Sequence, residues 1–268
     1  TRTRAELGNK MQGADLNHAA GEQAGYWGPV TASIDWCEDN YVVTEYIAEF
    51  YNTVSNIFLV VLGYIGVRMC VREGLGQNRD LLLLFATIAL VGLGSALFHG
   101  TLLKVSQQAD ETPMIIAITQ YVYLLWKDKL PYTSGKLWPT LIWSHNIAFA
   151  VLHWRYEWVT AFQVYFGIWS VLAAVRLRHM YKHELQELPV VRRLIKWYFF
   201  TWLFGVAVWQ VDFHLCHHVN QLPINPQGHA WWHMSVGVAS FLGPLALAFV
   251  EAKKRGLNPS IRFHGGLL

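Results

Sequence analysis

Residues 81–101 read LLLLFATIALVGLGSALFHGT, a continuous stretch that contains no Lys, Arg, Asp or Glu. A helix needs about 20 mostly apolar residues to cross the roughly 30 Å hydrocarbon core of a bilayer, so this stretch predicts a membrane span. Ser95 and His99 lie near its end, four residues apart and therefore on one face of the predicted helix. The stretch indicates both the class of the protein and the place of a polar site.

The composition of the whole chain points to the same class. Of 268 residues, 53% are hydrophobic, 15% aromatic and only 15% charged, whereas soluble domains carry about 25% charged residues. A net charge of +3 without a Lys/Arg stripe argues against nucleic-acid binding. Three cysteines exclude a disulfide-rich scaffold, and the apolar content excludes disorder. The sequence predicts an integral membrane protein.

Seven stretches qualify as membrane helices, so the expected fold is an all-α, seven-transmembrane helix bundle. These stretches cover residues 50–71, 81–101, 112–126, 137–153, 159–177, 194–216 and 230–251. The expected organisation is a polar N-terminal segment, an acidic segment, the seven-helix body and a basic tail, at residues 1–25, 26–49, 50–251 and 252–268. The polar N-terminal segment lacks the apolar region of a signal peptide.

The distribution of basic residues predicts the orientation. Sixteen of the 21 Lys and Arg residues fall in the loops after the first, third and fifth spans and in the C-terminal tail. The positive-inside rule therefore places the C-terminus in the cytosol and the N-terminus on the lumenal or extracytoplasmic side. Cys37 and Cys216 then share the non-cytosolic side, where disulfides persist, so a disulfide between them is predicted. An unreactive pair of thiols is the alternative.

Three histidines are predicted at one depth of the membrane. His229 and His233 are four residues apart at the start of the last span, at the same non-cytosolic level as His99. A single His in a span often only hydrogen-bonds a neighbouring helix. Three of them at one depth favour a metal, because three protein nitrogens with one open position are the coordination of a catalytic zinc site.

Two further polar residues accompany the histidines. Asp110 and Glu111 are expected to open the third span, on the same side of the membrane. A carboxylate beside a metal-activated water can act as general base and acid; the alternative is a helix N-terminal acid stabilised by the macrodipole. The Ser95 hydroxyl is placed to donate to an oxyanion, or else it bonds its own i−4 carbonyl, as is common in membrane helices.

A second cluster is acidic and precedes the first span. The run DWCEDN at 35–40 is followed by Glu45 and Glu49, with almost no compensating Lys. Dense oxygen donors predict a hard cation such as calcium, and a solvated acidic turn is the alternative. A third group of polar residues near the end of the sixth span is interpreted as loop and interfacial residues rather than a metal site; it comprises Asp212, His214, His217 and His218.

Five motifs resemble those of the alkaline ceramidase family, and most closely its alkaline ceramidase 3 and its fungal and plant phytoceramidase members. They are GYWGPVTASIDWCEDNY at 25–41, YIAEFYNTVSN at 46–56, GSALFH at 94–99, DETPM at 110–114 and HAWWH at 229–233. The motifs occur in order over nearly the whole chain after residue 25. The wider superfamily of intramembrane hydrolases also includes the adiponectin receptors.

The resemblance implies specific roles for residues. The zinc ligands that it implies are His99, His229 and His233. Its catalytic residues match Ser95 and Asp110. Its calcium ligands match the side chains of Asp35, Glu38, Asn40 and Glu49 and the backbone carbonyl of Trp36. The cysteine pair of the family matches Cys37 and Cys216.

The implied function is zinc-dependent hydrolysis of ceramide, phytoceramide or dihydroceramide to a sphingoid base and a fatty acid, activated or stabilised by calcium. The implied location is the endoplasmic reticulum or Golgi membrane, and the expected partners are the bilayer and the substrate, with no nucleic acid and no obligate protein. The alternatives are a hydrolase of another lipid amide and a seven-helix lipid-binding receptor with a structural zinc. Asp110 argues against the receptor, because a closed structural site needs no carboxylate beside the metal.

Overall fold

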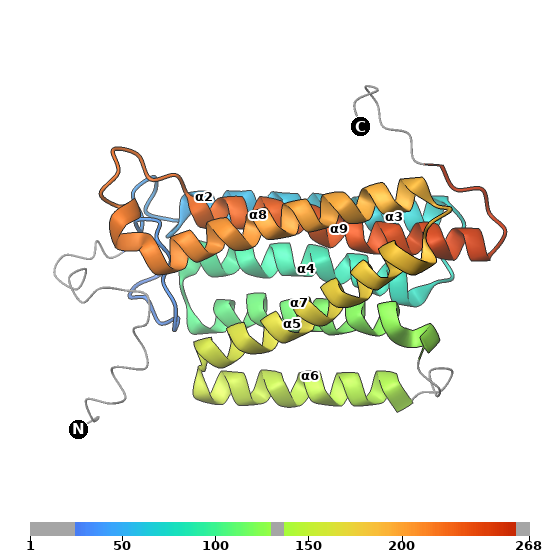
Figure 1. Ribbon diagram of the computed structural model, residues 1–268. Helices are drawn as coiled ribbons and strands as arrows, with labels where there is room; N and C mark the ends of the chain where they lie inside the picture. Colours follow the sequence, from blue (N-terminus) through green and yellow to red (C-terminus); the bar gives the residue numbers. More distant parts are fainter. Residues whose placement is uncertain (1–24, 130–136, 261–268) are drawn as a thin grey trace.

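The computed structural model describes residues 25–129 and 137–260 (Figure 1). In this part of the chain the regular structure is helical, with one isolated β-bridge between Thr44 and Ile47. The helices are α2 (Phe50–Ser55), α3 (Ile57–Arg72), α4 (Arg79–Thr101), α5 (Lys104–Trp126), η1 (Lys127–Lys129), α6 (Leu137–Tyr156), α7 (Val159–His179), η2 (Met180–Glu184), α8 (Pro189–Val219) and α9 (Gly228–Lys254). The all-α prediction is confirmed. The predicted polar segment up to residue 24 and the tail from 261 to 268 lie outside the described residues.

Each predicted span coincides with a helix, but the third begins earlier than predicted. Helix α5 starts at Lys104, so Asp110 lies inside it and the alternative of a helix N-terminal acid is wrong. The first turns of α5 are polar, which made them resemble a loop. Their side chains nevertheless find partners in the fold: Gln107 accepts from the Ser33 backbone N–H at 2.8 Å and donates to Glu111 at 3.0 Å.

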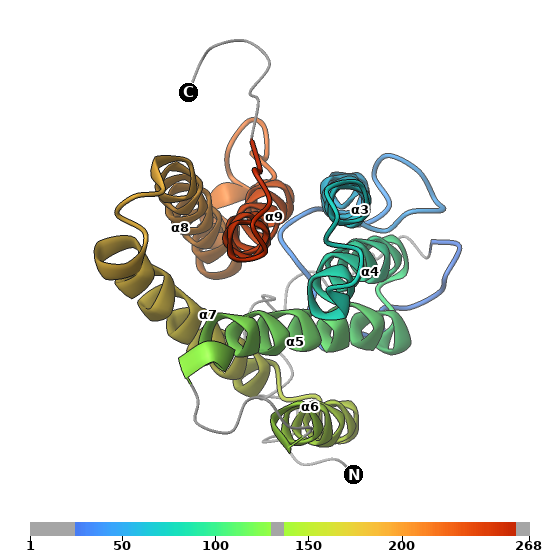
Figure 2. The same ribbon diagram turned by 90° about the vertical axis from the view of Figure 1, so that its right-hand side faces the viewer.

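The long helices run side by side in an up-and-down arrangement (Figure 1). Seen along the bundle, α9 lies between α8 and α3, α4 lies between α3 and α5, and α6 lies outside α5 (Figure 2). Glycines permit close contacts between helices. A Cβ at Gly63 of α3 would lie 2.6 Å from the backbone nitrogen of Ala89 in α4. Small residues of this kind let membrane helices approach, where van der Waals packing rather than the hydrophobic effect holds them.

Five of the described helical segments are long and apolar enough to cross a membrane: Phe50–Arg72, Arg79–Thr101, Val159–Glu184, Pro189–Val219 and Gly228–Lys254. Their outer faces carry exposed apolar side chains, such as Leu90, Leu93 and Leu97 of α4, which suit contact with lipid. Helices α5 and α6 are similarly long but less apolar, because α5 contains the polar turns around Asp110 and α6 contains several Trp, His and Asn residues. The protein is membrane-embedded.

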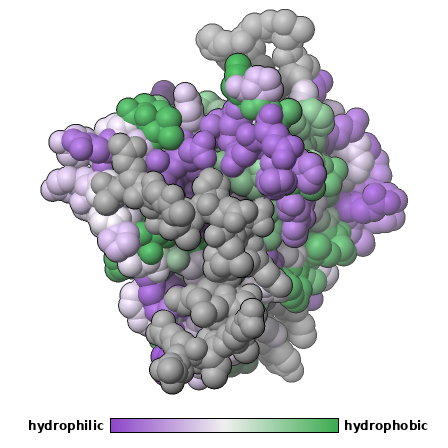
Figure 3. Space-filling model, turned by 90° about the vertical axis from the view of Figure 1, so that its left-hand side faces the viewer, coloured by the Kyte–Doolittle hydropathy of each residue, from purple (hydrophilic) through white to green (hydrophobic). Residues whose placement is uncertain are grey.

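One end of the bundle, called here the α2 end, consists of the segment 25–49, the turn between α4 and α5 and the loop between α8 and α9 (Figure 1). Its surface is largely hydrophilic (Figure 3). The backbone N–H groups of Thr31 and Ala32 donate to the carbonyl of Leu102, at 3.1 and 3.0 Å. A disulfide joins Cys37 to Cys216 of α8, which confirms the predicted pairing and fixes the segment across the bundle.

Candidate active site

The three predicted histidines meet near the α2 end of the bundle. His99 comes from the last turn of α4, and His229 and His233 come from the first two turns of α9. All three are buried, and one ring nitrogen of each lies within 4.8 Å of the others. The four-residue spacing in α9 and the antiparallel packing of α4 against it therefore bring three imidazoles to one point.

The hydrogen bonds around these rings leave nitrogens free for a metal. The Glu49 carboxylate contacts His99 Nδ1, and the Ser55 hydroxyl lies 2.8 Å from His233 Nδ1. In contrast, His99 Nε2 and His229 Nδ1 are buried without a hydrogen-bond partner. Burying such groups unpaired is costly. A carboxylate on the second nitrogen of a His is the usual support of a metal ligand, so the residues present fit a metal ion.

Residues of α8 and of the acidic segment hold the start of α9 in place. Asp212 Oδ1 accepts from the backbone N–H of His229 at 3.1 Å, and its Oδ2 accepts from that of Cys37 at 3.4 Å. The Trp36 ring stacks on His229, with 3.7 Å between ring centroids. Asp212 is only 3% exposed, so its interpretation as a loop or interfacial residue is wrong.

The reason is that α8 continues to Val219 and turns this side chain towards α9. The neighbouring histidines of the same stretch, His214, His217 and His218, are exposed near the end of α8, as an interfacial position requires.

Asp110 and Ser95 face the same cavity as two of the histidines. The cavity has a volume of about 220 Å³, and its wall includes Ser95, Asp110, His229 and His233. Asp110 Oδ1 is buried and has no hydrogen-bond partner, and the Ser95 hydroxyl interacts with the Asp110 carboxyl. A free carboxylate oxygen beside a candidate metal site has the position of a general base.

A glycine explains why α4 and α5 come so close at this point. A Cβ at Gly94 would lie only 2.0 Å from the carbonyl oxygen of Ala109. Because Gly94 has no side chain, the backbones touch directly, and the next residue of each helix, Ser95 and Asp110, meet across the contact.

The acidic segment lies against the histidines rather than apart from them. Asn40 Nδ2 donates to Asp35 at 3.1 Å, Asp35 interacts with Glu49, and the Trp36 N–H donates to Glu49 at 3.0 Å. Asn40 Oδ1 is buried without a partner. Glu38 is turned towards α2, where it accepts from the N–H groups of Tyr51 and Asn52, at 2.7 and 2.8 Å.

Two carboxyl groups of this segment have strongly perturbed acidities. Burial raises the pKa of Glu38 to about 7, and the neighbouring Glu49 contributes to the rise. Burial likewise raises the pKa of Glu49 to about 7, with a smaller contribution from Asp212. The carboxylates of this segment have little positive charge around them, and Asn40 Oδ1 has no partner. Such a set of oxygen donors fits a hard cation such as calcium.

Some contacts of the site were not expected from the sequence. Ser55 supports His233, and the buried Glu111 carboxylate, expected only at the start of the third span, contacts His153 of α6 beside the cavity. Gln107 donates to Glu111, one turn away on α5, and to Ser33 of the segment 25–49. Apart from this one-turn contact, the contacts join residues far apart in the chain, and no spacing along one helix would have indicated them.

Comparison with known proteins identifies the family of the chain. The sequence profile of the ceramidase family matches residues 28–264. The chain is 37% identical to an alkaline ceramidase of Arabidopsis thaliana, over 91% of this chain and 93% of the relative. It is 29% identical to alkaline ceramidase 3 of Mus musculus, over 92% and 94%, and 30% identical to the alkaline ceramidase YPC1 of Saccharomyces cerevisiae, over 92% and 85%. The chain belongs to the ceramidase family.

Proposed function

We propose that this protein is a zinc-dependent amidase that hydrolyses ceramide, including its phyto and dihydro forms, within the membrane of the endoplasmic reticulum or Golgi. The observation that carries the proposal is the free carboxylate oxygen of Asp110, which faces the same cavity as His229 and His233. The relatives named alkaline ceramidases support the substrate class. A lipid-binding receptor with a structural metal would have no use for this carboxylate.

The residues divide the chemistry among them. His99, His229 and His233 would hold the zinc ion. When bound, the ion would lower the pKa of a water molecule and polarise the amide carbonyl as a Lewis acid. Asp110 accepts a proton from the attacking water, and the Ser95 hydroxyl turns from Asp110 to donate to the amide carbonyl oxygen. Such a donor is worth about 3 kcal/mol in known oxyanion holes. Asp110 then gives its proton to the amine nitrogen as the carbon–nitrogen bond breaks, which yields the sphingoid base and the fatty acid.

Calcium is assigned a structural and activating role at the acidic segment. Its ligands would be the side chains of Asp35, Glu38, Asn40 and Glu49 and the carbonyl of Trp36. Several of these residues also touch the histidines: Glu49 contacts His99, and Trp36 stacks on His229. A cation that orders this segment therefore orders the surroundings of the zinc ligands.

The proposed topology is seven spans, with the α2 end on the lumenal side. Helix α5 packs beside α4 and α7, and α6 packs along the outer side of α5 (Figure 2), so both are counted as spans beside the five more apolar ones. The disulfide at the α2 end supports a lumenal position, because disulfides persist in oxidising compartments. The excess of Lys and Arg in the loops at the opposite end supports a cytosolic position for that end.

The test is fatty-acid release from a panel of ceramides and other lipid amides by purified protein, with metal content measured in parallel. We expect the wild type to cleave ceramide and the Asp110→Asn variant to lose about 10²- to 10⁴-fold in rate while keeping its zinc. The control is Asp80→Asn, which alters an acid at the opposite end of the bundle and is expected to keep full activity.

Two results would contradict the proposal. An Asp110→Asn variant as active as the wild type would remove the assigned base. A zinc-loaded wild type that cleaves no ceramide in the presence of calcium would favour the lipid-binding alternative, and cleavage of a different lipid amide alone would change the substrate class.

A further inference from the structure

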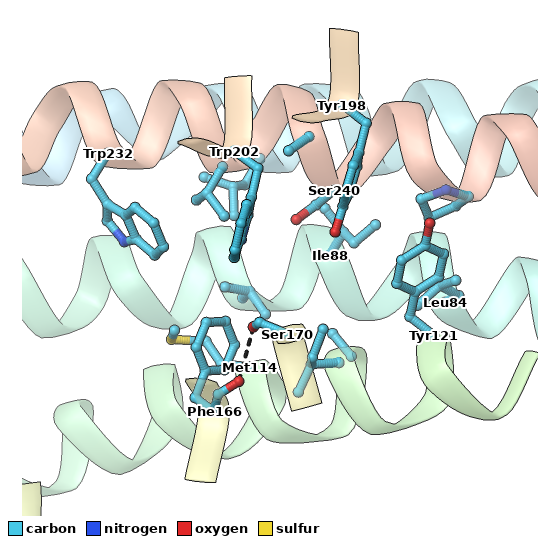
Figure 4. A pocket seen from close by; sticks show the side chains of 17 residues that line it. Leu84, Ile88, Met114, Tyr121, Phe166, Ser170, Tyr198, Trp202, Trp232 and Ser240 are labelled. Carbon is cyan, nitrogen blue, oxygen red and sulfur yellow. Dashed lines mark hydrogen bonds between the residues drawn. The ribbon is translucent and has the colours of Figure 1, made fainter. Parts of the chain in front are cut away.

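The cavity that contains Asp110 does not end at the histidines. A second, inner cavity of about 90 Å³ lies next to it in the bundle (Figure 4). The two cavities share part of their wall, which includes Met114, Phe166, Trp202, Trp232 and Val236. Protein interiors normally contain few voids larger than a water molecule. A second cavity that shares its wall with the candidate active-site cavity therefore indicates a place for part of the substrate.

The wall of the inner cavity suits a hydrocarbon chain. Leu84 and Ile88 of α4 and Ala239 of α9 are among its apolar lining residues. The Ser170 hydroxyl on the wall donates to the carbonyl oxygen of Phe166 at 2.8 Å (Figure 4), so it is already satisfied. Apolar cavities accept apolar ligands, whereas a polar headgroup would lose its hydration here and could reach only a few hydroxyls, such as that of Tyr121.

Two tyrosines stand at the inner cavity, on the side away from the histidines. Tyr121 projects from α5 and Tyr198 from α8 on the opposite wall, with 6.4 Å between their ring centroids (Figure 4). A Cβ at Gly243 of α9 would lie 2.3 Å from the Tyr121 hydroxyl and 3.3 Å from the Tyr198 ring. The end of the Tyr121 side chain thus rests against the backbone of α9 at a position where glycine leaves room for it, and the Tyr198 ring lies close to the same point.

We propose that the inner cavity holds the far end of one alkyl chain of the substrate, and that Tyr121 and Tyr198 set the longest chain that is hydrolysed efficiently. The two tyrosines are specificity-determining residues, remote from the reacting bond. This inference rests on the proposed function, since the chain that enters the cavity is attached to the amide held beside Asp110.

The contribution of Tyr121 is steric. Its hydroxyl is buried and has no hydrogen-bond partner, so no hydrogen bond from the hydroxyl holds the ring in place. Removal of the hydroxyl leaves the ring as a barrier, whereas removal of the ring opens the cavity. The pair Tyr121→Phe and Tyr121→Ala therefore separates a steric barrier from a polar one. Ser240→Leu provides the opposite change, because Ser240 lines the inner cavity and a larger side chain there shortens it.

The experiment measures kcat/KM for two substrate series. In one, the acyl chain is lengthened on a fixed sphingoid base; in the other, the base is lengthened on a fixed acyl chain. We expect Tyr121→Ala to gain at least about tenfold for longer chains relative to shorter ones in one series, because a methylene in a closed apolar pocket changes substrate discrimination by about 10- to 200-fold. The series that responds identifies the chain in the cavity. Tyr121→Phe should keep the wild-type length profile, and Ser240→Leu should shift it towards shorter chains.

Controls separate a change of length preference from general damage. Leu125 lies one turn from Tyr121 on α5 and is buried, but it is absent from the walls of both cavities. Leu125→Ala should therefore lower thermal stability and leave the length profile unchanged. If Tyr121→Ala does not fold, Ser240→Leu still tests the proposal, because it adds volume instead of removing a ring.

A length profile that stays as in the wild type in both Tyr121→Ala and Ser240→Leu, with active folded protein, would overturn the inference while the proposed function stands. A wild type that cleaves no ceramide would overturn the proposed function instead. In that case, thermal stabilisation by free fatty acids and sphingoid bases of graded length decides the inference: stabilisation that moves to longer chains in Tyr121→Ala supports it, and an unchanged optimum contradicts it.

Discussion

The two ends of the helix bundle treat their polar residues in opposite ways. At the α2 end, Asp110, Asp212 and Glu49 are buried: Glu49 contacts His99, Asp212 accepts from the backbone of His229, and Asp110 lines the same cavity as His229. At the opposite end, Lys254 and Asp128 form an ion pair at 2.5 Å with more than half of each side chain exposed. Burial of polar groups lowers stability, so their concentration at the α2 end marks that end as the candidate active site. The exposed ion pair at the opposite end only joins helices.

The disulfide at the α2 end should give the largest effect on stability. Replacing both Cys37 and Cys216 by Ser is expected to lower the free energy of unfolding by about 2–5 kcal/mol, because the bond closes a loop of 179 residues. Thermal unfolding of detergent-purified protein measures this. Cys70→Ser is the control, since Cys70 is a free thiol. An equal loss in both variants would mean that the cross-link itself contributes nothing.

Glu49 should give the next largest effect, and on metal binding rather than on the fold alone. Glu49→Gln is expected to weaken zinc binding about 10- to 100-fold, because partners of metal-bound His typically contribute this much. Glu38→Gln is the matched control: Glu38 is a proposed calcium ligand whose carboxylate accepts from the N-terminus of α2, so its change should weaken calcium binding and lower zinc affinity less than Glu49→Gln does. Competition with a zinc chelator distinguishes the two. Equal zinc affinities in Glu49→Gln and wild type would contradict the assigned support of His99.

An ion pair between Arg176 and Glu184 at the opposite end allows a direct contrast. Arg176 of α7 is buried and donates twice to Glu184, at 2.8 Å for each bond, and once to the carbonyl of Leu125. Glu184→Gln should lower the free energy of unfolding by about 1–2 kcal/mol, less than the 3–5 kcal/mol of a fully buried pair because Glu184 is partly exposed. Zinc content should stay at the wild-type level. Loss of zinc in this variant would mean that the two ends are coupled.

The smallest effect is expected at the exposed pair of Lys254 and Asp128. Lys254→Ala should change stability by less than about 1 kcal/mol, as is usual for surface ion pairs. The hydrogen bond from Lys254 lowers the pKa of Asp128. The contribution of this ion pair to the free energy of unfolding is therefore present above the ordinary pKa of an Asp, and it is lost as the pH falls through the lowered pKa of Asp128. Unfolding measured at neutral and acidic pH tests this: the difference between wild type and variant should disappear in acid, and a difference that grows there would contradict the sign.

Local patterns in the sequence were sufficient for the helices and for part of the site. Apolar stretches of sufficient length predicted the positions of the helices, and the four-residue spacings placed Ser95 with His99 and His229 with His233. The start of α5 was missed because its polar side chains are satisfied by other segments. The roles of Asp212 and Ser55 depend on which helix faces which, and this is decided by packing between segments distant in the chain.

The contact at Gly94 has a consequence for how the enzyme can be altered. Ser95 and Asp110 are brought together by two helix backbones in direct contact, while Tyr121 and Tyr198 of the inner cavity are separate side chains on α5 and α8. The residues proposed to break the bond are thus placed by a backbone contact, and those proposed to select the substrate are placed by side-chain packing. Laboratory evolution of new lipid specificities can begin at these two side chains, provided that position 94 stays glycine.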